Sequence, residues 1–338
     1  MNHFLRKKAM IQERVLSKCR MMPRLFCKVM TFPNVLKAVG AVLVGYLAMS
    51  YLHQVTYVWQ CTTLGDTLRP VAREVCPVLP DKWSGTIDGK RLTIGILMVY
   101  DDHYGGSDER LVPRLIRNRE VYCAKHECTV ISGATAKSKG STPARPPAWE
   151  KLTSILKQLN TNQFDYILYV DMDMIIMNPE KSPESFLRQA PPLQDFILTN
   201  DWSGVNTGVM FVRNSEFSKW FLQTAYNQVQ LVEKFSSTGT PHPFEYEQRA
   251  FHFLLNTEVW QSRNLPRYQG NSTELRSHFT SLPQCSMNSY LLHPLEFRAN
   301  REESHYIESD FIVHLAGKKG QIKTDLTNYF LTQAEEEY

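Results

Sequence analysis

The chain has 338 residues, of which 43% are hydrophobic and 21% charged, enough for one large or two small folded domains. Its formal net charge is only +4, and the positive excess lies at the N-terminus, where residues 1–37 hold nine Lys or Arg and one acidic side chain. The rest of the chain carries 29 basic and 33 acidic side chains. Because a nucleic-acid-binding domain concentrates basic charge in its folded part, this distribution argues against nucleic acid as a partner.

An uncharged apolar segment follows the basic N-terminus. Residues 38–58 span 21 positions, and a helix needs about 20 to cross the hydrocarbon core of a bilayer. Tyr57 and Trp59 suit the aromatic belt at the far interface, and the basic flank predicts that residues 1–37 are cytoplasmic. A cleaved signal peptide and a buried helix are the alternatives. The long basic region and the lack of an evident small-residue cleavage site favour a signal anchor, with the remaining chain in the secretory lumen.

The segment after the anchor is rich in proline and has no sustained periodicity. We expect residues 59–90 to form a lumenal stem, residues 91–330 a folded domain, and residues 331–338 a solvated acidic tail. Five cysteines follow the anchor, so one or two disulfides are possible, but their pairing cannot be deduced from the sequence. Asn271 opens an N-glycosylation sequon that would be usable only in the lumen.

Strands and helices alternate through the predicted domain. The apolar run Leu92–Tyr100 predicts a buried strand, which ends at Asp101 and Asp102. The later elements are a helix at Leu111–Lys125, a strand at Val130–Ile131, a helix at Trp149–Leu159, a strand at Phe164–Val170, a helix opened by Ser182, strands at Phe196–Leu198 and Gly208–Val212, and helices near residues 215–235 and 245–256. This order indicates an α/β domain with a central, mostly parallel sheet, whose ligands bind at the carboxyl ends of the strands.

Asp171 and Asp173 carry the strongest chemical signal. They follow the strand Phe164–Val170 directly, and side chains two residues apart in an extended segment point to the same side. Two converging carboxylates form a hard oxygen site suited to Mn²⁺ or Mg²⁺. Such a cation would stabilise the charge that develops on a departing nucleoside diphosphate. The alternative is a pair of solvated acids in a loop.

Three other groups of polar residues could complete a site. His314 follows an apolar triplet and could add a nitrogen ligand, while Lys318 and Lys319 could reach a diphosphate. Taken singly, such a histidine is more often a core residue and such lysines a solvated face. Residues 201–208 form a Gly-containing segment between two strands that could bind sugar hydroxyls, with an ordinary turn as the alternative. Glu247 and Gln248 open a helix, where acids are favoured in any case.

Taken together, these segments resemble one family. Its members are Golgi glycosyltransferases that include yeast α-galactosyl- and α-1,6-mannosyltransferases and plant xyloglucan α-xylosyltransferases. The resemblance covers about residues 91–320 and rests on NREVYCAKHECTVI (Asn118–Ile131), WEKL (Trp149–Leu152), DMD (Asp171–Asp173), NTGVMFVRNS (Asn206–Ser215), EQRAF (Glu247–Phe251) and HLAG (His314–Gly317).

The resemblance implies a single GT-A type nucleotide-sugar-binding domain, a divalent metal, and transfer of galactose, xylose or mannose to a glycan with retention of configuration. It implies Asp171, Asp173 and His314 as metal ligands. It assigns donor binding to Asp101, Lys151, Asp171, Asn206, Lys318 and Lys319, and catalysis to Glu247, Gln248 and Asp201. The enzyme would be a single-pass Golgi membrane protein that uses a UDP- or GDP-sugar and a glycan acceptor, with homo- or hetero-oligomers possible.

Two other functions are compatible with parts of the pattern. A membrane-anchored pseudoenzyme or glycan-binding protein could retain the same fold without turnover. A strand followed by Asp-x-Asp also occurs in haloacid-dehalogenase-like phosphatases, but Ile175 stands where those enzymes have a small hydroxyl residue or valine.

Overall fold

A computed structural model describes residues 32–62, 76–87, 89–100, 104, 106, 108–134, 145–233, 246–262, 266–293 and 304–337. The chain divides into two compact units, Met1–Trp59 and Gln60–Tyr338. Helix α3 (Phe32–Thr62) accounts for all the described residues of the first unit, and its segment Val39–Thr62 is long and apolar enough to cross a membrane. The predicted span 38–58 therefore lies inside a helix that begins earlier and ends later. Residues 1–31 of the predicted cytoplasmic tail lie outside the described residues.

The second unit is built on a six-stranded mixed sheet. Its strands stand in the order β4 (Thr129–Ala134), β3 (Ile94–Tyr100), β5 (Tyr166–Val170), β8 (Gly204–Arg213), β7 (Phe196–Asp201) and β9 (Phe279–Leu282). Every strand except β8 runs in the same direction. The prediction of an α/β domain with a mostly parallel sheet is thus confirmed. The exception arises because β7 and β8 are joined by a hairpin, which only antiparallel neighbours can form.

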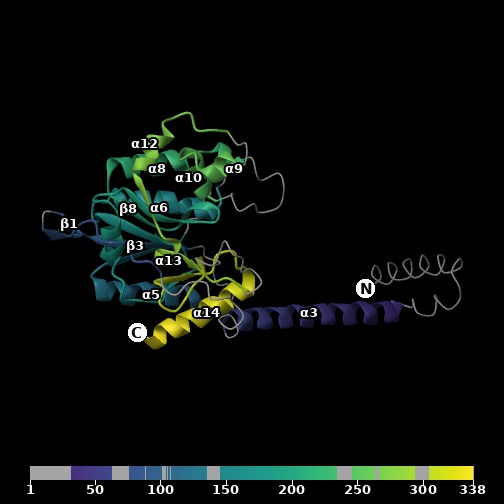
Figure 1. The fold of residues 1–338 in the computed structure, drawn as a ribbon. Coiled ribbons are helices and arrows are strands. Elements are labelled where there is room, and N and C mark those ends of the chain that lie inside the picture. The colour runs from purple at the N-terminus through teal and green to yellow at the C-terminus, as the bar shows by residue number, and fades with distance from the viewer. Residues whose placement is uncertain are drawn as a thin grey trace. The chain divides into compact units, whose positions relative to one another are not determined.

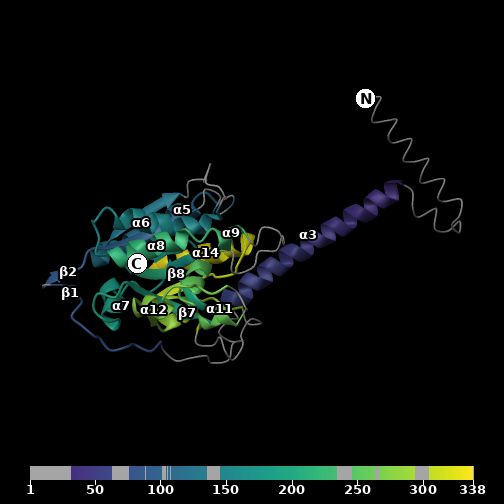
Figure 2. The same ribbon diagram turned by 90° about the horizontal axis from the view of Figure 1, so that it is seen from above.

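Both faces of this sheet are buried, as the apolar strand sequences predict. In β5, Ile167 and Tyr169 pack into one hydrophobic cluster, whereas Leu168 and Val170 pack into the other. Figure 1 shows helices on opposite sides of the sheet, and Figure 2 shows the same arrangement from above. One cluster includes side chains of α6 (Glu150–Leu159), α8 (Glu216–Tyr226) and α10 (Gln248–Leu254), and the other includes side chains of α5 (Leu111–His126) and α7 (Pro183–Gln189).

A small second sheet joins distant parts of the chain beside the end of β5. It consists of β10 (Ser289–Tyr290), β11 (Ile312–His314) and β6 (Met174–Ile176), with β11 in the middle. Because β6 begins one residue after Asp173, its pairing with β11 places His314 opposite Met174. The shorter elements are β1 (Thr86–Ile87), β2 (Lys90–Arg91), η1 (Pro147–Trp149), α9 (Gln230–Glu233), α11 (Glu258–Gln261), α12 (Ser272–Ser277) and α13 (Gln284–Met287).

Serine caps open two of the helices. Ser182 accepts a hydrogen bond from the Ser185 backbone N–H at the start of α7, and Ser215 accepts one from Ser218 at the start of α8. The cap predicted at Ser182 is therefore confirmed, since a serine oxygen satisfies one of the orphan N–H groups of the first turn. The helix predicted near residues 215–235 is interrupted, because α8 ends at Tyr226 and α9 begins at Gln230.

The predicted stem is wrong for its described C-terminal part, which belongs to the folded domain. Cys76 forms a disulfide with Cys285, and the Trp83 indole donates a hydrogen bond of 3.0 Å to the Leu187 carbonyl oxygen. Asp81 accepts a hydrogen bond of 2.9 Å from Arg188. A polar, proline-rich sequence without periodicity looked like a spacer, but a covalent bond and side-chain contacts anchor it to the domain surface.

The predicted acidic tail is also wrong. Helix α14 runs from Gly320 to Glu337 without a break at residue 331, and Leu331 and Ala334 are fully buried. Arg114 on α5 binds the Glu335 carboxylate through two hydrogen bonds of 2.9 Å. The acidic residues 335–337 suggested a solvated tail, but Leu331 and Ala334 are three residues apart and therefore lie on one face of the helix. A second disulfide, Cys123–Cys128, closes the C-terminal end of α5.

Candidate functional site

A cavity of about 680 Å³ opens where β5 and β7 end and β8 begins. Of the eleven site residues predicted from the sequence, ten line it: Lys151, Asp171, Asp173, Asp201, Asn206, Glu247, Gln248, His314, Lys318 and Lys319. The eleventh, Asp101, lies outside the described residues. Residues from both ends of the domain sequence thus meet at the carboxyl ends of the parallel strands, where ligands bind in sheets of this kind.

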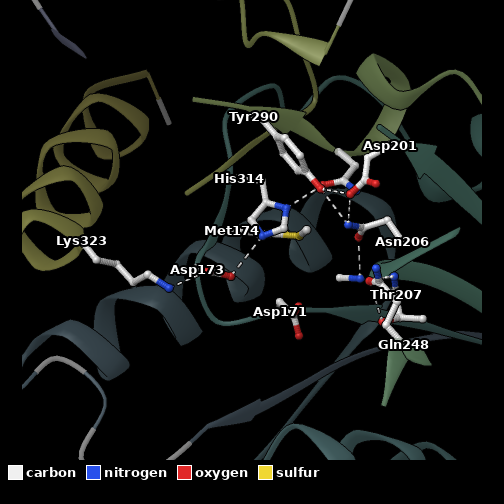
Figure 3. A network of polar contacts seen from close by, with 12 residues as sticks. Asp171, Asp173, Met174, Asp201, Asn206, Thr207, Gln248, Tyr290, His314 and Lys323 are labelled. Atoms are coloured by element: carbon white, nitrogen blue, oxygen red, sulfur yellow. Dashed lines mark hydrogen bonds and ion pairs between the residues drawn. The ribbon is translucent and has the colours of Figure 1, made fainter. Parts of the chain in front are cut away.

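Asp171, Asp173 and His314 form a compact group in this cavity. One ligand atom from each lies within 4.8 Å of the others. Figure 3 shows the His314 ring above Asp173, with Asp171 nearby. Two carboxylate oxygens and an imidazole nitrogen at this spacing suit a divalent cation such as Mn²⁺.

The tautomer of His314 is set by Asn288. The Asn288 side-chain N–H donates to the Thr199 hydroxyl at 3.0 Å, which directs the Asn288 carbonyl oxygen at His314 Nδ1, 2.7 Å away. In this arrangement Nδ1 carries the proton and donates it. His314 Nε2 is then left as a lone-pair donor, and it lies 3.4 Å from Asp173 Oδ1. A second partner that fixes the ring in this way is the usual support of a metal-binding histidine.

Asp173 has a second neighbour that the sequence did not reveal. Lys323, in the first turn of α14, donates a hydrogen bond of 2.7 Å to Asp173 Oδ2. Burial would raise the pKa of Asp173, but the positive charges of Lys323 and of His314, when its Nε2 is protonated, outweigh that effect and hold the pKa well below its usual range. The carboxylate is therefore ionised at neutral pH, as a metal ligand must be.

The turn that carries both carboxylates is held by two buried polar residues of α5. Arg119 donates to the carbonyl oxygens of Asp171, at 3.2 Å, and of Met174. The Asn118 side chain pairs with both backbone groups of Ile176, at 2.9 and 3.0 Å. The segment Asn118–Ile131 that supports the family resemblance therefore begins with residues that position the Asp171–Asp173 turn.

Asp171 also belongs to a buried ion-pair network with Lys151 and Glu247. The Lys151 ammonium is 2.7 Å from Glu247 Oε1 and 3.1 Å from Asp171 Oδ1, while Tyr169 donates its hydroxyl proton to the same Asp171 oxygen at 2.8 Å. Burial by itself would lower the pKa of Lys151, but the two carboxylates reverse the direction and raise it. Burial raises the pKa of Glu247, because the attraction of Lys151 only partly offsets desolvation.

Thr207 connects this network to Gln248. Its hydroxyl donates to Glu247 Oε1 at 2.7 Å, and its backbone N–H donates to the Gln248 side-chain carbonyl oxygen at 3.1 Å. The other carboxylate oxygen of Glu247, Oε2, is buried and makes no hydrogen bond within the described part of the chain. The pair Glu247–Gln248 is thus oriented by β8 rather than by its own helix.

Asp201, Asn206 and Tyr290 form a third network. Asp201 Oδ2 accepts hydrogen bonds from the Asn206 amide at 2.8 Å and from the Tyr290 hydroxyl. Burial and the nearby carboxylates raise the pKa of Tyr290, so its hydroxyl keeps its proton and acts as a donor. Of the two lysines, Lys318 is buried and Lys319 exposed, and both line the cavity near Lys323.

The sequence did not predict the contributions of Lys323, Asn288 and Tyr290 to the site. Lys323 could have been noticed as a third lysine close to the pair at 318 and 319. No pattern marked Asn288 or Tyr290, because each acts through a contact with a residue distant in the chain.

The sequence of the chain is similar to those of known glycosyltransferases. The sequence model of the galactosyl transferase GMA12/MNN10 family matches residues 91–191 and 181–323. The chain is also 24% identical over 238 residues to a probable alpha-1,6-mannosyltransferase, MNN10, of Saccharomyces cerevisiae. That alignment covers 60% of this chain and 54% of the yeast protein, so the chain spans about half the length of this relative.

Solved structures with a similar fold are glycosyltransferases. One is involved in glycosylation of the major capsid of PBCV-1, with 16% identity and a TM-score of 0.46, covering 70% of this chain and 99% of the other. Another is the galactosyltransferase LgtC in complex with donor and acceptor sugar analogues, with 12% identity and a TM-score of 0.36, covering 72% and 95%. Both likenesses are distant, and the family match carries the assignment.

Proposed function

Because the chain belongs to the galactosyl transferase GMA12/MNN10 family, we propose that it is a metal-dependent, retaining glycosyltransferase. It moves a hexosyl or pentosyl group, namely galactose, xylose or mannose, from a nucleotide-diphosphate sugar to a glycan acceptor. The observation that carries this proposal is the convergence of Asp171, Asp173 and His314 in a cavity that also contains Lys318 and Lys319. Carboxylates and imidazole suit a cation, and the lysines suit the diphosphate that the cation would accompany.

The chain's own residues fit a divalent metal as cofactor. Asp171, Asp173 and His314 would hold it, and Asn288 keeps His314 in the tautomer that can do so. A bound Mn²⁺ or Mg²⁺ supplies charge stabilisation of the departing diphosphate.

The ion-pair network of Lys151 and Glu247 would contact the transferred sugar rather than the metal. Lys151, Glu247 and Gln248 would orient the donor sugar, and Asp201 and Asn206 would stand at the boundary between donor and acceptor. As the bond between the sugar carbon and the phosphate oxygen loosens, positive charge develops on the sugar, and the Glu247 or Asp201 carboxylate stabilises it electrostatically. The acceptor hydroxyl attacks from the same face, and the departing phosphate oxygen takes its proton. A covalent sugar adduct on Glu247 would contradict this mechanism.

Helix α3 supports a membrane-anchored setting. With its N-terminal basic flank in the cytoplasm, a single-pass anchor would place the cavity in the Golgi lumen, where glycan acceptors are processed.

The test uses the full chain in detergent with Mn²⁺ and a panel of UDP- and GDP-sugars. Release of UDP or GDP from one donor is expected, with loss of release in Asp171→Asn and His314→Ala and on chelation. Asp81→Asn is the matched control, since Asp81 lies on the domain surface beside Arg188 and outside the cavity. Absence of both nucleotide binding and metal binding would refute the proposal in favour of a pseudoenzyme, and release of phosphate from simple esters would favour a phosphatase.

A further inference from the structure

A second cavity lies within the Gln60–Tyr338 unit, apart from the candidate functional site. Its volume is about 680 Å³, which suits a small-molecule ligand, and none of the described residues that line it lines the first cavity. Its walls come from the last residues of α3, from the segments that follow β6 and β10, from the turn before β11 and from the C-terminal half of α14. The proposed transfer reaction gives this cavity no role.

Three aromatic rings line the second cavity, and two of them are nearly perpendicular to the third. The rings of Tyr306 and Tyr329 both meet Phe330 edge to face, with centroid distances of 5.6 and 5.1 Å and interplanar angles of 82° and 89°. Phe330 is buried, whereas the two tyrosines are partly exposed. The Gln333 amide, one turn further along α14, donates a hydrogen bond of 3.0 Å to the Tyr329 hydroxyl oxygen. Rings that line one space in different orientations can present their electron-rich faces to a cation from more than one side, as in the aromatic cages that hold quaternary ammonium groups.

The second cavity is negatively charged. Glu308 and Glu337 are exposed, and the described residues that line the cavity include no lysine, arginine or histidine. Two hydrogen bonds close the turn that carries Glu308, since the Ile307 N–H donates to Asp310 Oδ2 at 3.0 Å and the Asp310 N–H donates to the Ile307 carbonyl oxygen at 2.9 Å. The first cavity, in contrast, contains four lysines. The second cavity therefore attracts a cation and repels the nucleoside diphosphate that the first one would bind.

The end of the predicted membrane span forms part of the second cavity. Cys61 and Thr62 line it, and they are the last two residues of the segment Val39–Thr62 that is long and apolar enough to cross a membrane. The preceding residue, Gln60, pairs through its side chain with His293 Nε2 at 2.8 Å, a contact inside the same unit. With the N-terminal flank cytoplasmic, Thr62 ends the span at the lumenal leaflet, so the chain keeps one wall of the cavity within reach of lipid headgroups.

We propose that the second cavity binds the quaternary ammonium group of a phosphocholine headgroup in the lumenal leaflet. The rings of Tyr306, Tyr329 and Phe330 would contact the methylated nitrogen, and Glu308 and Glu337 would supply the opposite charge. A quaternary nitrogen carries methyl groups instead of N–H donors, so it packs on rings where a primary ammonium would lose hydrogen bonds to water.

The shape of this headgroup agrees with the place of the cavity in the chain. The ammonium is the outermost group of phosphocholine, so it can enter the cavity while the phosphate stays at the membrane surface, away from the two carboxylates. A bound lipid would give the domain a second attachment to the membrane besides α3. The inference rests on the membrane setting of the proposed function and is independent of the transfer reaction.

The experiment measures binding of short-chain lipids to the full chain in a non-ionic detergent that has no choline group. Ligand-observed NMR would follow dihexanoyl-phosphatidylcholine, with the matching phosphatidylethanolamine, the matching phosphatidylglycerol and free phosphocholine as comparisons. The phosphatidylcholine should bind at least about tenfold more tightly than each comparison. The ethanolamine lipid lacks the methyl groups, the glycerol lipid lacks the cation, and free phosphocholine lacks the part that remains in the micelle.

Variants test the rings and the carboxylates separately. Tyr306→Ala and Tyr329→Ala should each weaken binding of phosphatidylcholine about tenfold, whereas Tyr306→Phe and Tyr329→Phe should retain most of it because the ring faces remain. The double variant Glu308→Gln/Glu337→Gln should weaken binding at least about threefold, and it should fold normally because both side chains are exposed. Trp220→Ala is the matched control, since it removes an exposed ring outside both cavities. Thermal unfolding identifies the variants that are folded.

Three results would each overturn the headgroup site. These are equal affinity for the phosphatidylcholine and the phosphatidylethanolamine, equal affinity for free phosphocholine, and unchanged binding in the folded alanine and glutamine variants. Tighter binding of a lysine-rich peptide than of the lipid would assign the cavity to a protein partner instead. The affinity for UDP or GDP with Mn²⁺ should be the same in every variant, so a native chain that binds the lipid but no nucleotide would contradict the proposed transferase and not this site.

Discussion

Replacement of Lys151 by methionine tests the buried ion-pair network directly. The Lys151 ammonium is 2.7 Å from Glu247 and 3.1 Å from Asp171, and Lys151 is 4% and Glu247 1% exposed. Methionine keeps the length and the apolar part of the side chain but removes the charge. The variant is left with two carboxylates and no cation between them, and Glu247 is shielded from water.

The size of the effect follows from burial. Breaking a buried ion pair by removal of one partner costs about 3–5 kcal/mol, because the remaining charge is uncompensated. In a domain of this size, each kcal/mol lowers Tm by about 2–4 °C, so the fall in Tm should be roughly 6–20 °C. Lys157→Met is the control on the same helix, since Lys157 is exposed and should change Tm by less than about 2 °C.

The loss should also depend on pH. Burial already raises the pKa of Glu247, and removal of Lys151 takes away the charge that opposes this rise. The folded variant therefore binds a proton at Glu247 more tightly than the unfolded chain does. Its stability falls as pH rises from about 4.3, the unfolded pKa, through the raised folded pKa. The Tm difference between Lys151→Met and the native protein should accordingly be smaller at pH 5 than at pH 8.

Thermal unfolding of the full chain in detergent, followed by fluorescence at both pH values, measures these differences. The double variant Lys151→Met/Glu247→Gln should recover much of the lost stability and should lose most of the pH dependence, because the buried acid is gone. A single variant as stable as the native protein, or a double variant as unstable as the single one at every pH, would refute the reasoning.

Four further outcomes are expected. Asn288→Ala should lower Mn²⁺ affinity about 10–100-fold in calorimetry, because His314 loses the partner that fixes its tautomer; an unchanged affinity would contradict this. Lys323→Met should raise Mn²⁺ affinity in the absence of nucleotide, since a cation beside the metal site is removed; a weaker affinity would show that Lys323 positions Asp173 instead. Cys285→Ser should cost about 2–5 kcal/mol in denaturant titrations under oxidising conditions, against no change under reducing ones. Asn271→Gln should abolish a glycosidase-sensitive mass shift of protein from secretory cells, and a native chain without that shift would argue against a lumenal domain.

The parts of the fold that the sequence predicted are those fixed by local patterns. The strand before Asp171 consists of five buried residues, and a short uninterrupted apolar run of that kind is typical of a strand inside a sheet covered on both faces. Ser182 followed by proline marks a helix start through a single hydrogen bond. The convergence of Asp171 and Asp201 could be expected, because β5 and β7 are parallel strands of one sheet and end at a shared edge. His314 reaches them by another route, since β11 belongs to the second sheet and pairs with β6.

The parts that it did not predict depend on partners far along the chain. Trp83 and Cys76 were assigned to a stem because their neighbours lack periodicity, yet each contacts a residue more than 100 positions away. Leu331 was assigned to a tail because acidic residues surround it. Its burial follows from the docking of α14 on α5, which Arg114 reinforces from a position over 200 residues earlier.

The antiparallel strand β8 was the least predictable feature, and it determines how the site is built. Because β8 lies between β5 and β7, its residues Asn206–Gly208 run beside Asp171, and the Asp171 backbone N–H donates to the Gly208 carbonyl oxygen at 2.8 Å. A Cβ at Gly208 would lie 3.1 Å from Asp171 Oδ2 and 2.8 Å from the Met174 side chain. The sequence NTG was therefore not a loose turn but a strand whose glycine makes room for the carboxylate. Three consecutive residues of β8 thus contact three parts of the site: Asn206 contacts Asp201, Thr207 contacts Glu247, and Gly208 contacts Asp171. A single strand therefore fixes the relative positions of the residues proposed to face the acceptor, the transferred sugar and the metal.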